Sequence, residues 1–288
     1  MIFTLPVGET RSEMVTLRTL GGIPLVVVAH PLARGAISLL GAQLLAWQPA
    51  GEDSVLWLSD ENTWTPGVAI RGGIPICWPW FGDWREPMHG FARTMPWDLT
   101  RCTETSENVV LTFELRSSPE SLALWPHAFT LIARFTIGRT CSVELEARGY
   151  HLSVGALHTY LRVGGPGRVS ITGLGDEYTD ELRDDAPGRQ DGPLALTEGE
   201  AIDRRYTRPT PVNQVWDRGL DRTIEARHDH HSDVVVWNPG SRVNGRLPHL
   251  GERAHQEFVC VETARLTRPM TATPHHPARL SVTLRVVR

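Results

Sequence analysis

Short runs of apolar or alternating residues recur along almost the whole chain, and glycine, proline, aspartate and asparagine separate them. Typical runs are LVVVAH at 25–30, FTLIARFTI at 129–137 and RLSVTLRVV at 279–287. A period of two with many β-branched and aromatic residues indicates strands, and only 117–124 and 241–257 have a helical pattern. Many short strands at this spacing are typical of a sandwich. The sequence therefore predicts an all-β fold.

The chain is long enough to bury a large core. Of its 288 residues, 41% are hydrophobic and 22% are charged, which is typical of globular proteins. No repeat or long linker divides it, so we predict one domain over 1–288, with 184–199 as its most loop-like stretch. No run reaches the roughly 18–20 apolar residues of a membrane span, and 1–14 lacks the pattern of a signal peptide. We predict a cytoplasmic protein with no membrane partner.

The charge of the chain excludes several function classes. Its formal net charge is −4, which argues against a nucleic-acid partner because binding to a phosphate backbone needs a concentrated basic surface. All 29 basic residues are arginine. Without lysine, the chain cannot form a Schiff base, attach pyridoxal phosphate or supply the lysine of a P-loop.

The stretch 71–97, RGGIPICWPWFGDWREPMHGFARTMPW, is rich in residues that bind small molecules. Arg71 and Arg93 offer planar forks of donors that match phosphate or carboxylate oxygens, and His89 lies between them in sequence. Four tryptophans offer flat apolar faces, against which a sugar ring can lie. Glycines among them allow close approach of the backbone to a ligand. The stretch is typical of the wall of a pocket for a polar, anionic ring.

This stretch and four shorter motifs resemble the glucose-6-phosphate 1-epimerases of the aldose 1-epimerase superfamily. The shorter motifs are ALHTY at 156–160, DRRY at 203–206, VVVWNP at 234–239 and FVCVE at 258–262. They occur in the order of the family, and the resemblance covers roughly residues 20–265. It implies a large twisted antiparallel β-sandwich of the galactose mutarotase-like supersandwich type, with the sugar site on its concave face.

Interconversion of sugar anomers requires a base at the C1 hydroxyl and an acid at the ring oxygen, which we expect on opposite sides of the pyranose. His158 and Glu262 are candidates because each is a polar residue inside an apolar strand. Alternation places His158 on one face with Ala156 and Tyr160. On the residues alone, a lone histidine on a strand more often belongs to the core or its rim, and a lone glutamate after an apolar run more often lies at the solvent edge of the strand. The resemblance implies His158 as the general acid and Glu262 as the general base.

Four further residues are candidates for substrate binding. Arg71 and Arg93 are a candidate phosphate clamp, and the alternatives are that they brace a turn or pair with an aspartate. The resemblance implies the matching pair on the sugar phosphate. His89 is expected to donate to the ring oxygen or a hydroxyl, and Asp203 to accept from sugar hydroxyls as an ionised carboxylate. Asp203 could instead form a turn or a salt bridge, and Asp180 is a second candidate for its role.

Two positions depart from the pattern of the family. Met88 stands where some relatives have a polar residue that helps to bind substrate, and Glu181 where relatives often have lysine. The substrate preference is therefore less defined than the reaction type.

No metal or cofactor is expected. The cluster His228–His231 offers only two ligands to either face of a strand, whereas catalytic zinc needs three, so a solvated loop is the better interpretation. The four cysteines form no C-x-x-C pair, and we expect Cys77 and Cys260 to pack in the core.

These observations predict an enzyme that equilibrates the α and β anomers of hexose 6-phosphates by acid–base ring opening. One alternative is a mutarotase for free aldoses, in which Arg71 and Arg93 meet no phosphate. Another is a non-catalytic protein of the same fold that binds sugar phosphates. Loss of His158 or Glu262 would have favoured this second alternative, and both residues are present.

Overall fold

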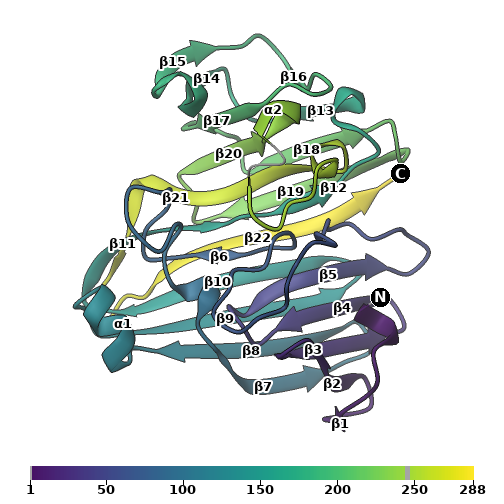
Figure 1. Ribbon diagram of the computed structural model, residues 1–288, viewed down its shortest axis with the longest axis vertical. Coiled ribbons are helices and arrows are strands. Elements are labelled where there is room, and N and C mark those ends of the chain that lie inside the picture. The colour runs from purple at the N-terminus through teal and green to yellow at the C-terminus, as the bar shows by residue number, and fades with distance from the viewer. Residues whose placement is uncertain (1, 244–246) are drawn as a thin grey trace.

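The computed structural model describes residues 2–243 and 247–288 of the chain, and these residues form mainly strands (Figure 1). Every strand pairing is antiparallel, which confirms the predicted all-β antiparallel fold. The described helices are all short. They are η1 (Ile2–Thr4), η2 (Ala92–Thr94), α1 (Pro119–Leu124), η3 (Pro166–Arg168), η4 (Glu181–Arg183), α2 (Gly240–Val243) and η6 (Ala254–Gln256).

The strands form three sheets. The first is a meander of β1 (Glu9–Thr10), β2 (Val15–Leu20), β3 (Ile23–His30), β4 (Ala33–Ser38) and β5 (Gln43–Pro49). The second has the order β16 (Leu194–Ala195), β13 (Val169–Thr172), β18 (Val212–Asp217), β19 (Arg222–Asp229), β22 (Ala278–Val287), β10 (Cys141–Gly149), β9 (Phe129–Gly138), β8 (Asn108–Arg116) and β7 (Asp98–Glu104). The third has the order β15 (Ala186–Arg189), β14 (Glu177–Asp180), β17 (Ile202–Tyr206), β20 (Asp233–Asn238), β21 (Phe258–Ala272), β11 (His151–Leu157) and β6 (Ile76–Cys77), and β12 (Tyr160–Arg162) also pairs with β21.

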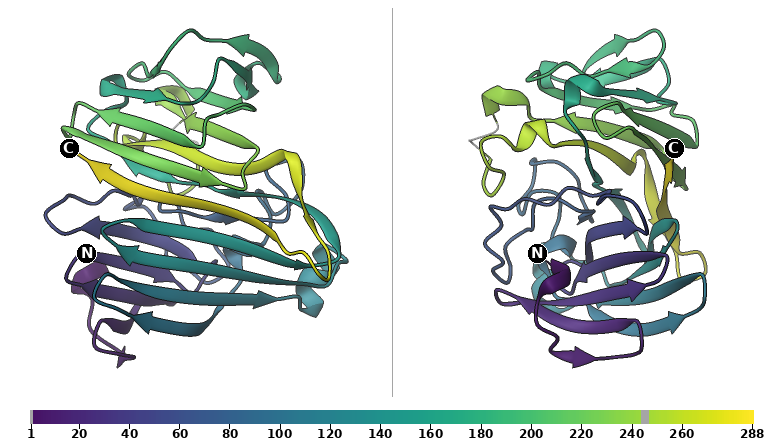
Figure 2. Two further views of the ribbon diagram at one scale, coloured as in Figure 1. Left: turned by 180° about the vertical axis from the view of Figure 1, so that it is seen from behind. Right: turned by 90° about the vertical axis from the view of Figure 1, so that its right-hand side faces the viewer.

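One hydrophobic cluster joins the three sheets. It contains Val26 of the first sheet, Leu145 and Leu280 of the second, and Val236 and Val261 of the third, all of them buried. Because side chains alternate across a strand, each sheet turns one apolar face to this cluster. The N-terminal strands lie at one end of the molecule and β13 to β17 at the other (Figures 1 and 2).

Two local predictions need correction. The helical pattern at 117–124 corresponds to α1, but the described part of 241–257 contains only the last residues of α2 and the short η6, and 244–246 lie outside the described residues. The loop expected at 184–199 contains the edge strands β15 and β16. Prolines and glycines hid these strands, since a strand at a sheet edge tolerates both.

None of the helices formed by the described residues has the length and apolar character needed to span a membrane.

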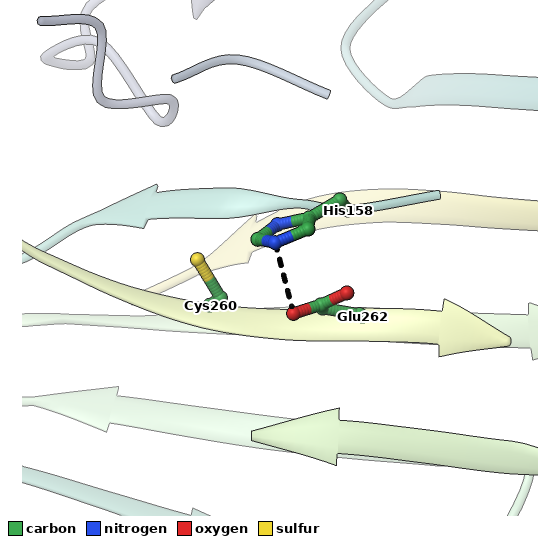
Figure 3. A group of neighbouring side chains, drawn as sticks. All are labelled: His158, Cys260 and Glu262. Carbon is green, nitrogen blue, oxygen red and sulfur yellow. Dashed lines mark ion pairs between the residues drawn. The ribbon is translucent and has the colours of Figure 1, made fainter. Parts of the chain in front are cut away.

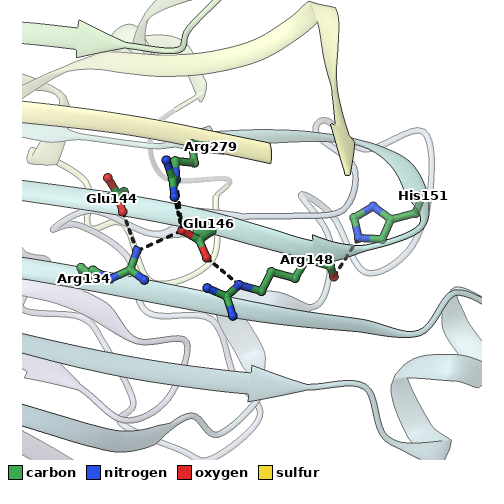
Figure 4. A network of polar contacts seen from close by, with 6 residues as sticks. All are labelled: Arg134, Glu144, Glu146, Arg148, His151 and Arg279. Carbon is green, nitrogen blue, oxygen red and sulfur yellow. Dashed lines mark hydrogen bonds and ion pairs between the residues drawn. The ribbon is translucent and has the colours of Figure 1, made fainter. Parts of the chain in front are cut away.

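Glu146 of β10 lies at the centre of an ionic network on the face of the nine-stranded sheet that points away from the core (Figure 4). Its side chain is fully buried beneath three arginines. Arg148 Nε donates to Oε1 at 2.6 Å, and Arg279 Nε donates to Oε2 at 3.0 Å. Arg134 Nη1 donates to the same Oε2 at 3.3 Å. Burial opposes ionisation, but the arginines outweigh it and lower the pKa of Glu146.

Glu146→Gln should therefore lower the free energy of unfolding at pH 7 by about 1.5–3 kcal/mol, the range for hydrogen bonds to charged groups. A carboxylate with a lowered pKa in the fold stabilises the protein above its unfolded pKa of 4.5, and this contribution is lost as the pH falls through the folded pKa. Denaturant titrations at pH 7 and below pH 4.5 should show the gap between variant and wild type closing in acid. Glu144→Gln is the control, because Glu144 bonds only to Arg134 and is 35% exposed. Equal losses in both variants would contradict this role of Glu146.

Candidate active site

A pocket of about 330 Å³ lies on the face of the eight-stranded sheet that points away from the core. In β20, Val234 and Val236 pack into the core, whereas Val235 and Trp237 line the pocket. The loop 81–89 supplies five of the residues that line it. The described residues that line the pocket are Arg71, Phe81, Gly82, Asp83, Met88, His89, His158, Glu181, Asp203, Val235, Trp237, Leu247 and Glu262. Five of the six residues selected from the sequence are among them, and Arg93 is not.

Strand register places His158 directly across from Glu262. Leu157 of β11 is paired with Thr263 of β21, and Tyr160 of β12 is paired with Cys260 of β21. The two pairings belong to one register, so the residues between the two strands continue it even though they lie outside both. His158 Nε2 lies 3.3 Å from Glu262 Oε1, and the two side chains are 7% and 1% exposed (Figure 3).

The two groups thus lie side by side, which differs from the expectation that they would lie on opposite sides of a pyranose. The C1 hydroxyl and the ring oxygen are both bonded to C1, so adjacent groups suffice to reach them. The His158 ring stacks on Tyr160 with centroids 4.7 Å apart, and Trp237 meets both rings edge-on, at 5.9 Å from His158 and 6.1 Å from Tyr160. The backbone N–H of His158 donates to Pro75 O at 3.0 Å. These contacts fix the orientation of the imidazole.

Burial shifts the two pKa values in opposite directions. It raises the pKa of Glu262 well above its usual value, and the carboxyls of Asp203 and Glu181 add to this effect. Burial also lowers the pKa of His158 well below its usual value, and nearby positive charge, chiefly that of His89 if protonated and of Arg93, adds to this effect. Both groups therefore favour their neutral forms. Transfer of one proton from the carboxyl to the imidazole converts them into an acid and a base.

Two atoms of the pair have no hydrogen-bond partner among the described residues. They are His158 Nδ1 and Glu262 Oε2, and both are buried. Buried polar atoms in folded proteins nearly always have a partner, so unpartnered atoms in a pocket indicate where a ligand binds.

His89 occupies a constrained position in the loop that closes the pocket. Its φ of 61° is unusual for a residue other than glycine, and strain of this kind occurs at functional sites. The Gly82 N–H donates to His89 Nδ1 at 3.1 Å, and the His89 N–H donates to Gly82 O at 2.8 Å. Burial, with Arg93 and Arg71, lowers the pKa of His89 to about 3. The neutral ring must carry its proton on Nε2, because Nδ1 accepts a hydrogen bond, and it can donate from that atom.

The glycine after His89 is required by close packing. A Cβ at Gly90 would lie 2.1 Å from Trp78 O, and the φ of Gly90 is 78°. Any larger residue would push the loop, and His89 with it, out of place.

The two arginines occupy different positions. Arg71 is partly exposed in the pocket, and its Nε donates to Pro248 O at 3.3 Å. Arg93 is 8% exposed, and its Nη2 donates to Met88 O at 2.6 Å behind the pocket wall. Burial lowers the pKa of Arg93. Within the described ranges neither arginine is paired with a carboxylate, which disagrees with the alternative of an Arg–Asp pair and leaves positive charge beside the pocket.

Asp203 faces the pocket from β17, where it pairs with Trp237 of β20. Burial raises its pKa to about 7, and Glu181 and Asp180 add to this effect. Asp203 is therefore only partly ionised at neutral pH, whereas the sequence suggested a fully ionised acceptor. The alternative of a salt bridge to its neighbours is not observed, because Arg204 lies over Tyr178 and Arg205 pairs with Asp185 at 3.3 Å.

Asp180 and Glu181 have the reverse of their expected importance. Asp180 accepts from the Leu182 N–H at 3.1 Å at the start of η4, so it stabilises a turn and does not line the pocket. Glu181 does line the pocket, and burial raises its pKa. Apart from its difference from relatives, no pattern in the sequence marked Glu181 as a pocket residue.

The histidine cluster at 228–231 is the solvated loop that we expected only in part, because Asp229 and His230 are exposed but His228 is not. His228 lies in β19 and is buried, with Nδ1 2.7 Å from Thr263 Oγ1 and Nε2 2.9 Å from Asn213 Oδ1. Burial lowers its pKa to about 3. The loop interpretation failed for His228, because a run of polar residues gave no sign that this one faces inward from a strand and has two hydrogen-bond partners.

A group of three metal-type ligands exists elsewhere, contrary to expectation. The ligand atoms of His158, Cys260 and Glu262 all lie within 4.8 Å of one another (Figure 3). Cys260 is buried as expected, but it adjoins His158 and Glu262. Cys77 is also buried and packs with Ala156 and Ala264.

The buried pair of His158 and Glu262 lies in a pocket on a large antiparallel sandwich. The family model described as aldose 1-epimerase matches residues 24–285, so the chain belongs to the aldose 1-epimerase family, and it is an isomerase. A Salmonella typhimurium protein named "putative glucose-6-phosphate 1-epimerase" is 43% identical over 100% of this chain and 98% of its own.

Solved structures agree with the family. The mutarotase-type protein YeaD of Salmonella typhimurium has a TM-score of 0.97 at 43% identity, over 100% of this chain and 98% of its own. A galactose mutarotase related enzyme of Lactobacillus acidophilus has a TM-score of 0.70 at 12% identity, over 91% of this chain and 97% of its own, and this likeness shows the fold alone. The supersandwich fold implied by the sequence motifs is confirmed.

Proposed function

We propose that the chain interconverts the α and β anomers of hexose 6-phosphates, as a glucose-6-phosphate 1-epimerase. The observation that carries this proposal is the 3.3 Å contact between His158 Nε2 and Glu262 Oε1 in a pocket that also holds the guanidinium of Arg71. The name of the full-length Salmonella relative supports the same reaction. The volume of the pocket, about 330 Å³, falls within the range for small-molecule sites.

In the proposed mechanism, Glu262 removes the proton of the C1 hydroxyl while His158 gives a proton to the ring oxygen. The bond between C1 and the ring oxygen breaks, and the sugar opens to its aldehyde. Rotation about the C1–C2 bond then presents the other face of the carbonyl. The same two groups work in reverse and close the ring as the other anomer.

Three more residues complete the proposed site. His89 donates from Nε2 to the ring oxygen or a neighbouring hydroxyl, and Asp203 accepts from a hydroxyl in its ionised form. Arg71 holds the phosphate, because it lines the pocket and pairs with no carboxylate among the residues that the structure describes. Arg93 contributes positive charge from behind the wall, and it fixes the loop that carries His89 through Met88 O.

The test of the proposal is magnetisation transfer between the anomers of glucose 6-phosphate, with free glucose as the comparison. Exchange that is catalysed for the phosphorylated sugar and much slower for the free sugar would support it. Faster exchange of free glucose would favour the free-aldose alternative. Binding of the phosphorylated sugar without exchange would favour a non-catalytic protein.

Chelation with excess EDTA should leave this exchange rate unchanged or raise it. His158 and Glu262 supply both proton transfers, so the reaction requires no Lewis acid. The measurement is the exchange rate before and after EDTA treatment, with dialysis against metal-free buffer as the control. A loss of activity that added zinc restores would overturn the metal-independent mechanism.

We further propose that the protein acts in the cytoplasm. All four cysteines are free, which suits a reducing compartment.

A further inference from the structure

We propose that His158, Cys260 and Glu262 form a binding site for zinc, through which a thiophilic divalent cation inhibits the enzyme. The inhibition rests on the proposed function of the acid–base pair. The binding itself does not, so it can be tested without any activity measurement.

The three residues are the ligand types that zinc prefers, namely an imidazole nitrogen, a thiolate and a carboxylate oxygen. One strand register brings them together. Cys260 and Glu262 are two residues apart and so lie on the same face of β21, and His158 lies across from Glu262. Figure 3 shows the thiol, the imidazole and the carboxylate on the same side of the strand. A rigid sheet therefore holds all three.

The distances suit a tetrahedral ion. Zinc bonds to nitrogen and oxygen of about 2.0–2.2 Å give a nitrogen–oxygen edge of about 3.4 Å in a tetrahedron. The observed separation of Nε2 and Oε1 is 3.3 Å. A zinc–sulfur bond of about 2.3 Å requires sulfur–nitrogen and sulfur–oxygen edges of about 3.6 Å. No ligand atom of the group lies more than 4.8 Å from another, so the thiol needs only a small rotation to bind.

The site is open to a ligand on one side only. His158 and Glu262 line the pocket, whereas Cys260 is fully buried next to them. Glu262 Oε2 is a buried atom without a hydrogen-bond partner in a side chain that is 1% exposed. Three protein ligands leave a fourth tetrahedral position for water on the pocket side.

A bound cation would stop the proposed reaction directly. It would occupy the nitrogen and the oxygen that exchange protons with the sugar, and neither lone pair would remain free. Zinc should therefore compete with the sugar. Magnesium should not compete, because it prefers oxygen ligands in octahedral geometry.

The binding test uses cobalt(II) in place of zinc, because a cobalt–thiolate bond has a charge-transfer absorption in the near ultraviolet. Cys102 is an exposed free thiol, so all proteins carry Cys102→Ser to remove its signal. Cys260→Ala removes the proposed ligand. Cys77→Ala is the matched control, because Cys77 is equally buried and lies near the site but outside the group. Cys260→Ser replaces Cys260→Ala if the alanine variant does not fold, since a serine hydroxyl gives no thiolate band.

We expect the thiolate band in the parent protein and in Cys77→Ala, and its absence in Cys260→Ala. Zinc should displace the cobalt, and it should slow anomer exchange at least about tenfold until EDTA is added. Cys260→Ala should keep its basal exchange rate and require at least about 10–100-fold more zinc, the range for losing even an outer partner of a metal ligand. Absence of the band in the parent, or equal zinc sensitivity of Cys260→Ala and the parent, would overturn the proposal. If no protein catalyses exchange, the cobalt spectra alone decide.

Discussion

Glu262→Gln should slow the exchange of glucose 6-phosphate anomers by about 10²–10⁴-fold, the usual contribution of a positioned acid or base. Glutamine keeps the shape of the side chain but cannot take up or release the proton. Because Glu262 is fully buried and already favours its neutral form, the substitution adds no new desolvation cost. We therefore expect substrate affinity to change little, and kcat to carry the loss.

The measurement is magnetisation transfer between the anomers, at several sugar concentrations so that kcat and KM separate. Glu225→Gln is a matched control, because Glu225 lies in β19 of the other large sheet, where Arg285 Nε donates to it at 2.9 Å. Its exchange rate should equal that of wild type. A Glu262→Gln enzyme within a few-fold of the wild-type rate would remove the acid–base mechanism.

His158→Ala should have a similar effect on exchange, and the double variant should lose much less than the product of the two single losses. Glu262 takes one proton from the substrate while His158 gives it another, so the two groups act as a unit. The losses from removing groups that act as a unit are strongly non-additive. Independent, multiplying losses would mean that the 3.3 Å contact has no part in the reaction.

Arg71→Ala should lower kcat/KM for glucose 6-phosphate by about 10–100-fold, which corresponds to about 1.4–2.7 kcal/mol and is close to the roughly 1.5–3 kcal/mol of hydrogen bonds to charged groups. A phosphate carries about −1.5 to −2 charges near pH 7 and can accept two hydrogen bonds from one guanidinium. Free glucose offers no such contact, so its slow exchange should barely change. Arg71→Lys should restore only part of the loss, because an ammonium supplies charge without the planar fork.

Two further arginine variants make this comparison selective. Arg116→Ala is the control, since that side chain is 73% exposed in β8, and it should affect neither sugar. Arg93→Ala should reduce the turnover of both sugars, because it removes the donor to Met88 O and loosens the loop that carries His89. Equal losses on both sugars in Arg71→Ala would show that Arg71 grips the ring or braces the fold, and would favour the free-aldose alternative.

The alternation of polar and apolar residues predicted much of the architecture and part of the site. In the ALHTY and FVCVE motifs, it correctly separated the face with His158 and Glu262 from the face with Leu157 and Val261, which packs into the core. This works because a period of two is a local property of a strand. The predicted catalytic roles of His158 and Glu262 stay predictions until the variants are measured.

The burial of each side chain, and which side chains meet in the pocket, could not be predicted, because both depend on how distant strands and loops pack. The sequence offers no reason to distinguish Arg71 from Arg93, but the side chain of Arg71 lies in the pocket and that of Arg93 lies behind its wall. Glu181 reaches the pocket because η4 follows β14, the strand next to the edge strand of the third sheet. Cys260 joins His158 and Glu262 through a register that the sequence does not state.

The position of β22 has a consequence for the synthesis of the protein. It follows every other strand of the nine-stranded sheet along the chain, yet it lies between β19 and β10 in the sheet. Until the ribosome has released it, β7–β10 and the β13–β19 group each expose an unpaired inner edge, and such edges invite pairing with other chains. We therefore expect the nascent chain to be most prone to pairing with other chains just before β22 emerges, and ribosome stalling near residue 278 to leave two half-sheets exposed.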